Sequence, residues 1–103
     1  MENYFVYILA SRARGTLYIG VTNNIGERLM QHRSGEIKGF TWKYNVKRLV
    51  FLEQTENVVA AIRREKQLKN WHRQWKINLI EKQNPDWRDL GQYYRLGPET
   101  SSG

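Results

Sequence analysis

The sequence predicts one α+β domain whose elements follow the order β-β-α-β-α-α. Three runs rich in β-branched and aromatic residues predict strands, and three segments with helical spacing of apolar residues predict helices. With 103 residues, 40% of them apolar, the chain can form a modest core of roughly two packed layers. We expect the domain to span residues 1–90 and residues 91–103 to form a flexible tail.

Residues 4–10 and 16–21 are the first two predicted strands. The first run has no polar alternation, which indicates a central strand buried on both faces. Gly15 permits the turn between the runs, so the second strand returns antiparallel. A nearly symmetric hairpin places Tyr7 and Tyr18, which are eleven positions apart, close together across the pair.

The first predicted helix begins after Asn24. The side chain of Asn24 can accept a hydrogen bond from the backbone at Glu27, in a capping-box arrangement. Ile25 and Leu29 form the buried stripe of this helix, and Gly35 supplies a C-terminal stop.

Arg28 and His32 stand four residues apart, so both project from the same side of that helix. The following residues, 36–45, mix glycine, lysine and aromatic residues and predict a mobile loop. Two readings of the loop stay open, because its aromatic residues suit a nucleic-acid contact and suit anchoring to the core equally well. Those aromatic residues are Phe40, Trp42 and Tyr44.

Residues 46–54 predict the third strand, and Thr55 is the expected N-cap of a second helix. The inner face of that helix is expected to carry Val58, Ala61, Ile62 and Leu68. Glu65 falls on the same face. A carboxylate there must be paired, hydrogen-bonded or metal-bound, because an unpaired buried charge is costly. An ion pair with a neighbouring arginine or lysine is the structural explanation of this residue.

The last predicted helix covers residues 73–82, after a break near Asn70. Three apolar residues at four-residue spacing predict core packing rather than a base-stacking platform: Trp71, Trp75 and Leu79. Pro85 disfavours helix at Asn84 and so ends this element.

Basic residues are concentrated in two segments of a chain whose net charge is +7. Residues 28–48 contain six basic residues against one acidic residue, and so do residues 63–76. Such segments favour a polyanionic partner such as DNA, although a solvated basic surface is the simpler alternative. Cysteine is absent, which excludes disulfide and thiolate metal sites, and no apolar run reaches membrane-spanning length. We expect a cytoplasmic protein without a membrane partner, in an oligomeric state that the sequence does not indicate.

The remaining candidate residues suffice for phosphodiester hydrolysis. The sequence lacks a P-loop, and no two histidines stand at zinc-binding spacing. One hard metal ion, Mg²⁺ or Mn²⁺, held by Glu65 and waters can polarise a phosphate. Arg28 can neutralise charge that develops on that phosphate, and a tyrosinate can take the proton of the attacking water.

Several of these features together resemble the GIY-YIG nuclease superfamily. They are Phe5-Val6-Tyr7, Tyr18-Ile19-Gly20, Arg28, Glu65 and the closing segment 84–90. The resemblance covers residues 3–90 and is closest to small single-domain bacterial members, which are related to the catalytic domain of the nucleotide-excision-repair incision subunit. Phe5-Val6 stands where the family's first motif has Gly-Ile. The tyrosine of that motif is kept.

The resemblance implies a central three-stranded antiparallel sheet flanked by helices, and divalent-metal-dependent cleavage of DNA. By position, Tyr7 and Tyr18 would be the motif tyrosines, one of them the general base. Arg28 would contact the scissile phosphate, Glu65 would hold the metal, and His32 matches a position that is histidine in some members. Many relatives also carry an attached DNA-binding module, which we do not expect in this chain.

We therefore expect a metal-dependent DNA endonuclease, acting on branched or damaged DNA in repair or recombination. The candidate DNA contacts are Arg28, Arg33, Lys38, Lys43, Arg63, Lys66, Lys69 and, as a loosely aligned late asparagine, Asn84. One alternative is a non-catalytic or partner-dependent nucleic-acid-binding module of the same fold. Another is a protein-interaction domain with a basic surface. Glu65 amid a basic helix disfavours pure binding, which needs no carboxylate there.

Overall fold

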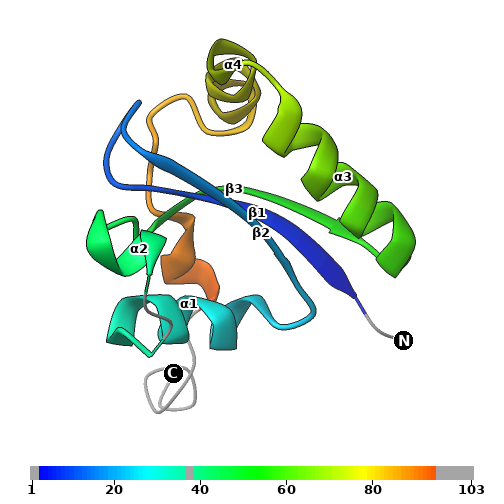
Figure 1. Ribbon diagram of the computed structural model, residues 1–103, viewed down its shortest axis with the longest axis horizontal. Helices are drawn as coiled ribbons and strands as arrows, with labels where there is room; N and C mark the ends of the chain where they lie inside the picture. Colours follow the sequence, from blue (N-terminus) through cyan, green and yellow to red (C-terminus); the bar gives the residue numbers. More distant parts are fainter. Residues whose placement is uncertain (1–2, 37–38, 95–103) are drawn as a thin grey trace.

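A three-stranded antiparallel sheet forms the centre of the computed structural model, which describes residues 3–36 and 39–94 (Figure 1). The strands are β1 (Tyr4–Ala10), β2 (Leu17–Thr22) and β3 (Arg48–Thr55), arranged in the order β2-β1-β3. The predicted fold class and element order are confirmed. β1 is the central strand and is buried on both faces, as its uninterrupted apolar run predicted.

The hairpin register places both tyrosines of interest on the same face of the sheet. Tyr7 pairs with Gly20, and Leu9 pairs with Tyr18. Because side chains alternate between faces along a strand, Tyr7 and Leu9 share a face, and their partners on β2 share it with them. Tyr7 and Tyr18 are therefore diagonal neighbours, as the symmetric hairpin predicted.

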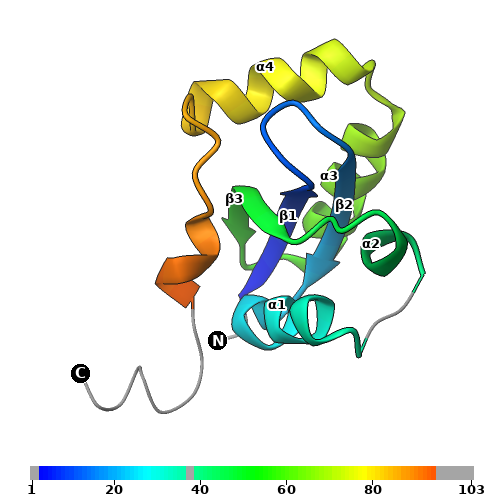
Figure 2. The same cartoon turned by 90° about the vertical axis from the view of Figure 1, so that its left-hand side faces the viewer.

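Helices cover both faces of the sheet (Figures 1 and 2). α3 (Val58–Asn70) and α4 (Arg73–Gln83) pack over one face, and α1 (Ile25–Ser34) covers the other. Val6 and Ile8 point into the first interface, whereas Tyr7 and Leu9 point into the second. The sheet thus separates two cores, and the Tyr7 side chain belongs to the core beneath α1. None of the described helices is both long and apolar enough to cross a membrane.

α1 begins and ends as its sequence predicts. The Asn24 side chain accepts a hydrogen bond of 3.0 Å from the backbone N–H of Glu27. Ile25 and Leu29 are buried against the sheet. Gly35 closes the helix with φ of 82°, a left-handed conformation that favours glycine.

The segment predicted as a loop contains a short helix, α2 (Phe40–Lys43). Thr41 is its buried residue, and the carbonyl of Thr41 accepts a hydrogen bond from the N–H of Val46. This bond holds the chain in a tight return before β3, which begins at residue 48 rather than 46. Four residues of mixed character carry too little periodicity to predict a helix.

The start of α3 differs from its prediction. Asn57, not Thr55, caps the helix and accepts a hydrogen bond of 3.0 Å from the N–H of Ala60. Thr55 is the last residue of β3, and its hydroxyl accepts a hydrogen bond from the N–H of Asn57. Both residue types can cap a helix, so local sequence did not distinguish them.

The buried faces of α3 and α4 were only partly predicted. On α3, Ala61 and Leu68 are buried as expected, whereas Val58 and Ile62 are exposed. On α4 the buried residues are Ile77 and Ile80. Trp75 is exposed, and Trp71 and Leu79 are partly buried against the core.

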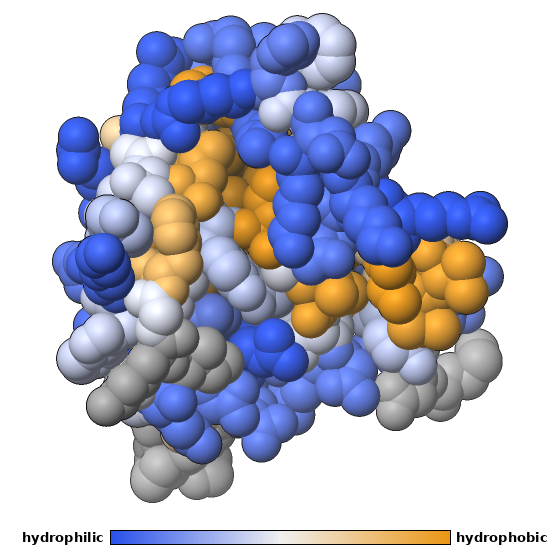
Figure 3. Space-filling view, in the orientation of Figure 1, coloured by the Kyte–Doolittle hydropathy of each residue, from blue (hydrophilic) through white to orange (hydrophobic). Residues whose placement is uncertain are grey.

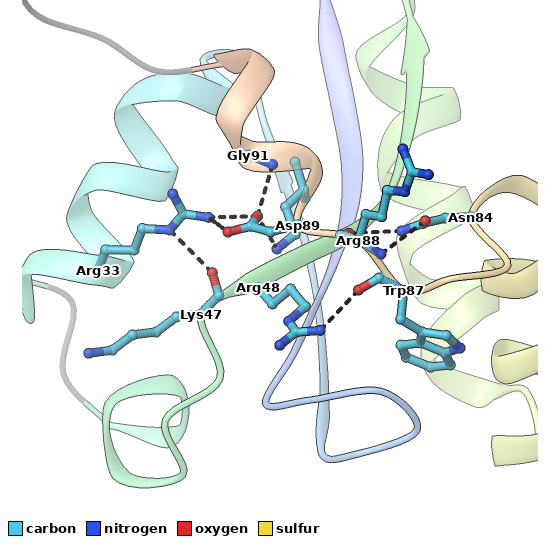
Figure 4. Close-up of polar contacts among 9 residues, drawn as sticks. Arg33, Lys47, Arg48, Asn84, Trp87, Arg88, Asp89 and Gly91 are labelled. Atoms are coloured by element: carbon cyan, nitrogen blue, oxygen red, sulfur yellow. Dashed lines mark hydrogen bonds and ion pairs between the residues drawn. The ribbon is translucent and has the colours of Figure 1, made fainter. Parts of the chain in front are cut away.

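The chain after α4 is held to α1 and β3 by polar contacts (Figure 4). Both carboxylate oxygens of Asp89 accept hydrogen bonds of 2.8 Å from Arg33 on α1. Asp89 also accepts from the backbone N–H groups of Leu49 and Gly91. Gly91 lies within the 3₁₀ helix η1 (Leu90–Tyr94), so the expected domain end at residue 90 falls inside an element. The rest of the expected tail, residues 95–103, lies outside the described residues.

Candidate functional site

Three aromatic side chains from separate elements meet beneath α1. The ring centroids of Tyr7 on β1 and Tyr18 on β2 are 6.3 Å apart. His32 on α1 lies 6.0 Å from the ring of Tyr7 and 5.4 Å from that of Tyr18. Tyr7 and His32 are buried, and Tyr18 is partly exposed. The hairpin and the first helix together position this group.

Gly20 makes room for the Tyr7 ring. The two residues are cross-strand partners, and the Tyr7 side chain lies directly over the Gly20 backbone. A Cβ atom at Gly20 would stand 2.5 Å from Cζ of Tyr7 and closer still to its hydroxyl oxygen. Because real Cβ contacts are not that short, any other residue at position 20 would displace Tyr7.

A buried hydrogen-bond chain runs from Tyr7 to α2. The Tyr7 hydroxyl lies 3.1 Å from Nε2 of His32, and Nδ1 of His32 lies 3.0 Å from the hydroxyl oxygen of Thr41. Burial, and then the charge of Arg28, lower the pKa of His32, so its ring is neutral at pH 7. The sequence did not point to Thr41, because its partner is nine positions away in another element.

Tyr7 is held in its protonated form. Burial first, and then the neighbouring Tyr18, raise the pKa of Tyr7 to about 12. Arg28 acts in the opposite direction through its charge and a hydrogen bond, and the charge of Glu65 raises the pKa slightly. Arg28 offers only donors to the Tyr7 oxygen, so the Tyr7 proton points to Nε2 of His32. The Nδ1–H of His32 then donates to Thr41.

Glu65 is partly buried on α3 and pairs with Lys69 one turn later. Its carboxylate lies 3.1 Å from the Lys69 ammonium. This is the ion pair that the sequence left open as the structural explanation. The lysine is half exposed, so the pair contributes about 0–1 kcal/mol to stability and can open at little cost.

The donor set for a metal ion consists of one carboxylate. Within residues 3–36 and 39–94, no group of three or more histidine, aspartate or glutamate side chains is placed to hold a metal. Mg²⁺ commonly keeps several waters and binds one or two carboxylates together with substrate phosphates. Glu65, partly exposed and paired with the half-exposed Lys69, fits that mode of binding.

A cleft of about 320 Å³ runs along the edge strand β2. It is lined by Leu17, Tyr18, Ile19, Phe40, Lys69 and Lys76. The cleft therefore joins β2, α2, α3 and α4. Figure 3 shows apolar surface near the middle of this face, bordered by hydrophilic surface. The lining thus includes the site tyrosine Tyr18 and two lysines.

Four of the predicted DNA contacts are exposed or line the cleft, and a fifth is not described by the structure. Arg63 and Lys66 are exposed on α3, and Lys43 is exposed on α2, where its ammonium lies 5.5 Å from the centre of the Tyr44 ring. Lys69 lines the cleft. Lys38 lies outside the described residues.

Two predicted DNA contacts have structural roles in this fold. Arg33 makes the bidentate pair with Asp89, and its Nε donates to the carbonyl of Lys47. Asn84 is buried, and its amide donates to the carbonyls of Val50 and Arg88 and accepts from the N–H of Arg88. The polar groups of Asn84 thus make hydrogen bonds within the protein, and its role as a nucleic-acid contact stays a prediction.

Comparisons with known proteins agree on one family. A family model described as the GIY-YIG catalytic domain matches residues 3–78. A UPF0213 protein of Syntrophus aciditrophicus is 39% identical over 87 residues, which cover 84% of this chain and 98% of that protein. A UPF0213 protein of Staphylococcus aureus strain Mu3 is 32% identical over 79% of this chain and 98% of its own length. The solution NMR structure of a UPF0213 protein from Bacillus halodurans superposes with a TM-score of 0.54 at 26% identity, covering 91% of this chain and 99% of that one.

Proposed function

This chain belongs to the GIY-YIG catalytic domain family, and from that premise we propose that it is a divalent-metal-dependent DNA endonuclease. Nuclease activity is what the family membership suggests, and GIY-YIG nucleases generally use a divalent metal. The observation that carries the proposal is the group of Tyr7, Tyr18 and His32, whose ring centroids lie 5.4 to 6.3 Å apart. Tyr18 of this group also lines the cleft that contains Lys69 and Lys76. The charges of Arg28 and Glu65 shift the pKa of Tyr7 in opposite directions, which supports their place near this group.

In the proposed reaction Arg28 binds the scissile phosphate. Arg28 lowers the pKa of Tyr7 through its charge and a hydrogen bond, and its guanidinium would offer donors to the phosphate oxygens. Lys69 and Lys76 hold the neighbouring phosphates along the cleft. Glu65 would hold the Mg²⁺ or Mn²⁺ ion, releasing Lys69 to the DNA. When bound, the metal supplies charge neutralisation at the phosphate and the leaving oxygen.

We assign different roles to the two tyrosines. Tyr7 is buried and has a pKa of about 12, so at neutral pH it orients its neighbours and does not accept a proton. Tyr18 lines the cleft, where a water attacking the phosphate would stand. It is therefore the proposed general base, acting as a tyrosinate that has first released its own proton to solvent. The chain through His32 to Thr41 fixes the orientation of Tyr7.

The test of the proposal is a cleavage assay on duplex, nicked, flapped and branched DNA with Mg²⁺ or Mn²⁺. We expect cleavage of at least one branched or nicked substrate, and its complete loss when a chelator removes the metal. Arg28→Ala should lower the rate by about 10²–10³-fold, because it removes a donor to the charged phosphate. Salt-sensitive binding of all four DNAs without cleavage in either metal would instead establish the binding-module alternative.

The hydroxyl of Thr41 is expected to matter for catalysis although it lies outside the cleft. Thr41→Val leaves Nδ1–H of the buried His32 without a partner. The tautomer of the His32 ring and the orientation of Tyr7 are then no longer fixed. We expect the cleavage kcat to fall about tenfold with little change in KM. Thr41→Ser keeps the hydroxyl and should retain most of the activity.

Nitrogen-15 chemical shifts of the His32 ring show whether Thr41→Val loses activity through the His32 tautomer or through a general loss of structure. The wild type and Thr41→Ser should show the proton on Nδ1, and Thr41→Val should show a mixture of tautomers. A folded Thr41→Val protein with wild-type kcat and an unchanged His32 tautomer would rule out this role.

A further inference from the structure

Two aromatic side chains of the α2 segment stand exposed beside the cleft. Phe40 is 46% exposed and Tyr44 is 48% exposed, and their ring centroids are 5.0 Å apart. The Phe40 ring also lies 6.3 Å from that of Tyr18, with an angle of 29° between the two planes. An aromatic row thus leads from the proposed general base to the protein surface.

Packing does not explain why these two rings are exposed. Thr41 and Val46 are the buried residues that attach this segment to the core. The ring of Trp42 covers Gly35, with Cζ3 2.5 Å from the position of a Cβ at that glycine. The sequence left open that the aromatic residues anchor this segment to the core. In the structure Thr41, Trp42 and Val46 make the anchoring contacts, and Phe40 and Tyr44 do not.

The cleft that Phe40 lines combines aromatic, apolar and cationic side chains. Leu17 and Ile19 contribute apolar surface, and Lys69 and Lys76 contribute positive charge from α3 and α4. Its volume of about 320 Å³ is at the low end for sites that enclose a small molecule, about 300–1,000 Å³. A flat apolar ring joined to a phosphate has the chemistry that such a cleft accommodates.

We propose that this cleft stacks an unpaired nucleobase of single-stranded DNA on Phe40, with its phosphates on Lys69 and Lys76. The proposal rests on the proposed function and names the substrate class of the same site. A base within a duplex is stacked on its neighbours on both faces, so its face is not available to Phe40. Stacking on a side chain accepts any base, so the cleft selects for an unpaired strand and not for a sequence.

Binding without metal tests this inference independently of cleavage. In the presence of a chelator, fluorescence anisotropy measures the affinity for a labelled single-stranded oligothymidine and for a duplex of the same length. We expect the wild type to bind the single strand more tightly. Phe40→Ala should weaken single-strand binding about tenfold while changing duplex binding less than twofold. Phe40→Trp should restore it, because the larger ring still stacks.

Tyr93→Ala is the matched control, because Tyr93 is an exposed aromatic residue on η1, away from the cleft. It should leave both affinities unchanged. An equal loss for single strand and duplex in Phe40→Ala, or no loss in a protein with wild-type thermal stability, would overturn the inference. Cleavage together with unchanged binding in Phe40→Ala would leave the endonuclease proposal standing alone. Phe40-dependent single-strand binding without cleavage in any metal would support the stacking inference and refute the endonuclease proposal.

Discussion

Replacement of Glu65 by glutamine is expected to lower the DNA cleavage rate by at least about 10³-fold. Glutamine keeps the size of the side chain but removes the negative charge. Since Glu65 is the one proposed protein ligand, the variant should no longer hold Mg²⁺ or Mn²⁺ at the site. The ion pair with Lys69 is half exposed, so we expect the free energy of unfolding to change by about 1 kcal/mol or less.

Three measurements on Glu65→Gln separate metal loss from misfolding: initial cleavage rates, Mn²⁺ binding by calorimetry, and urea unfolding. Glu53→Gln is the matched control. Glu53 is a half-exposed carboxylate paired with Arg64 at 2.9 Å, and it does not line the cleft. We expect this control to cleave DNA like the wild type. A Glu65→Gln protein with wild-type activity in Mg²⁺ would refute the assignment of Glu65 as metal ligand.

Replacement of Gly20 by alanine is expected to damage both stability and catalysis. The added methyl group would stand too close to the hydroxyl and ring carbons of Tyr7, so the ring must move within a packed core. We expect a loss of about 1–3 kcal/mol in the free energy of unfolding, measured in urea. We also expect a fall of about 10²-fold in kcat, because a misplacement of about 1 Å of the groups that Tyr7 orients has that order of effect.

A double-mutant cycle identifies the cause of the stability loss. In a Tyr7→Leu background the smaller side chain leaves space over residue 20, so the cost of Gly20→Ala should fall by at least about 1 kcal/mol. An equal cost in both backgrounds would mean that Tyr7 is not the group displaced. In that case the glycine would be required for the strand backbone itself.

The hairpin and the first helix were predicted well because local sequence determines them. The uninterrupted apolar run of β1 and the turn at Gly15 predict an antiparallel pair, whereas the register that sets the faces of both tyrosines comes from the structure. That register alone brings Tyr7 and Tyr18 together. The Asn24 cap and the Gly35 stop are likewise decided by residues within a few positions of each other.

Contacts between distant segments account for the parts that the sequence did not predict. From its sequence, Arg33 was predicted to contact DNA. In the structure it pairs with Asp89, which lies 56 positions later in the chain. The role of Thr41 depends on the same kind of placement, since its hydroxyl matters only because His32 is buried next to it. No spacing rule connects such pairs.

Glu65 shows how a structural and a functional interpretation can both apply to one residue. The sequence left an ion pair and a metal ligand as alternatives, and the structure contains the ion pair. Such a partly exposed pair is weak, so a divalent cation can replace the lysine ammonium without a large loss of stability. The released Lys69 already lines the cleft where DNA phosphates are proposed to lie.

The contact between Arg33 and Asp89 has a consequence for the order of events during protein synthesis. Every strand of the sheet and all of α1 precede Asp89 in the chain, yet α1 obtains one of its anchors only from that carboxylate. While the ribosome is still translating the segment after α4, the helix that carries Arg28 and His32 lacks this support. The support that Asp89 gives to α1 is therefore added only after the segment that follows α4 has been synthesised.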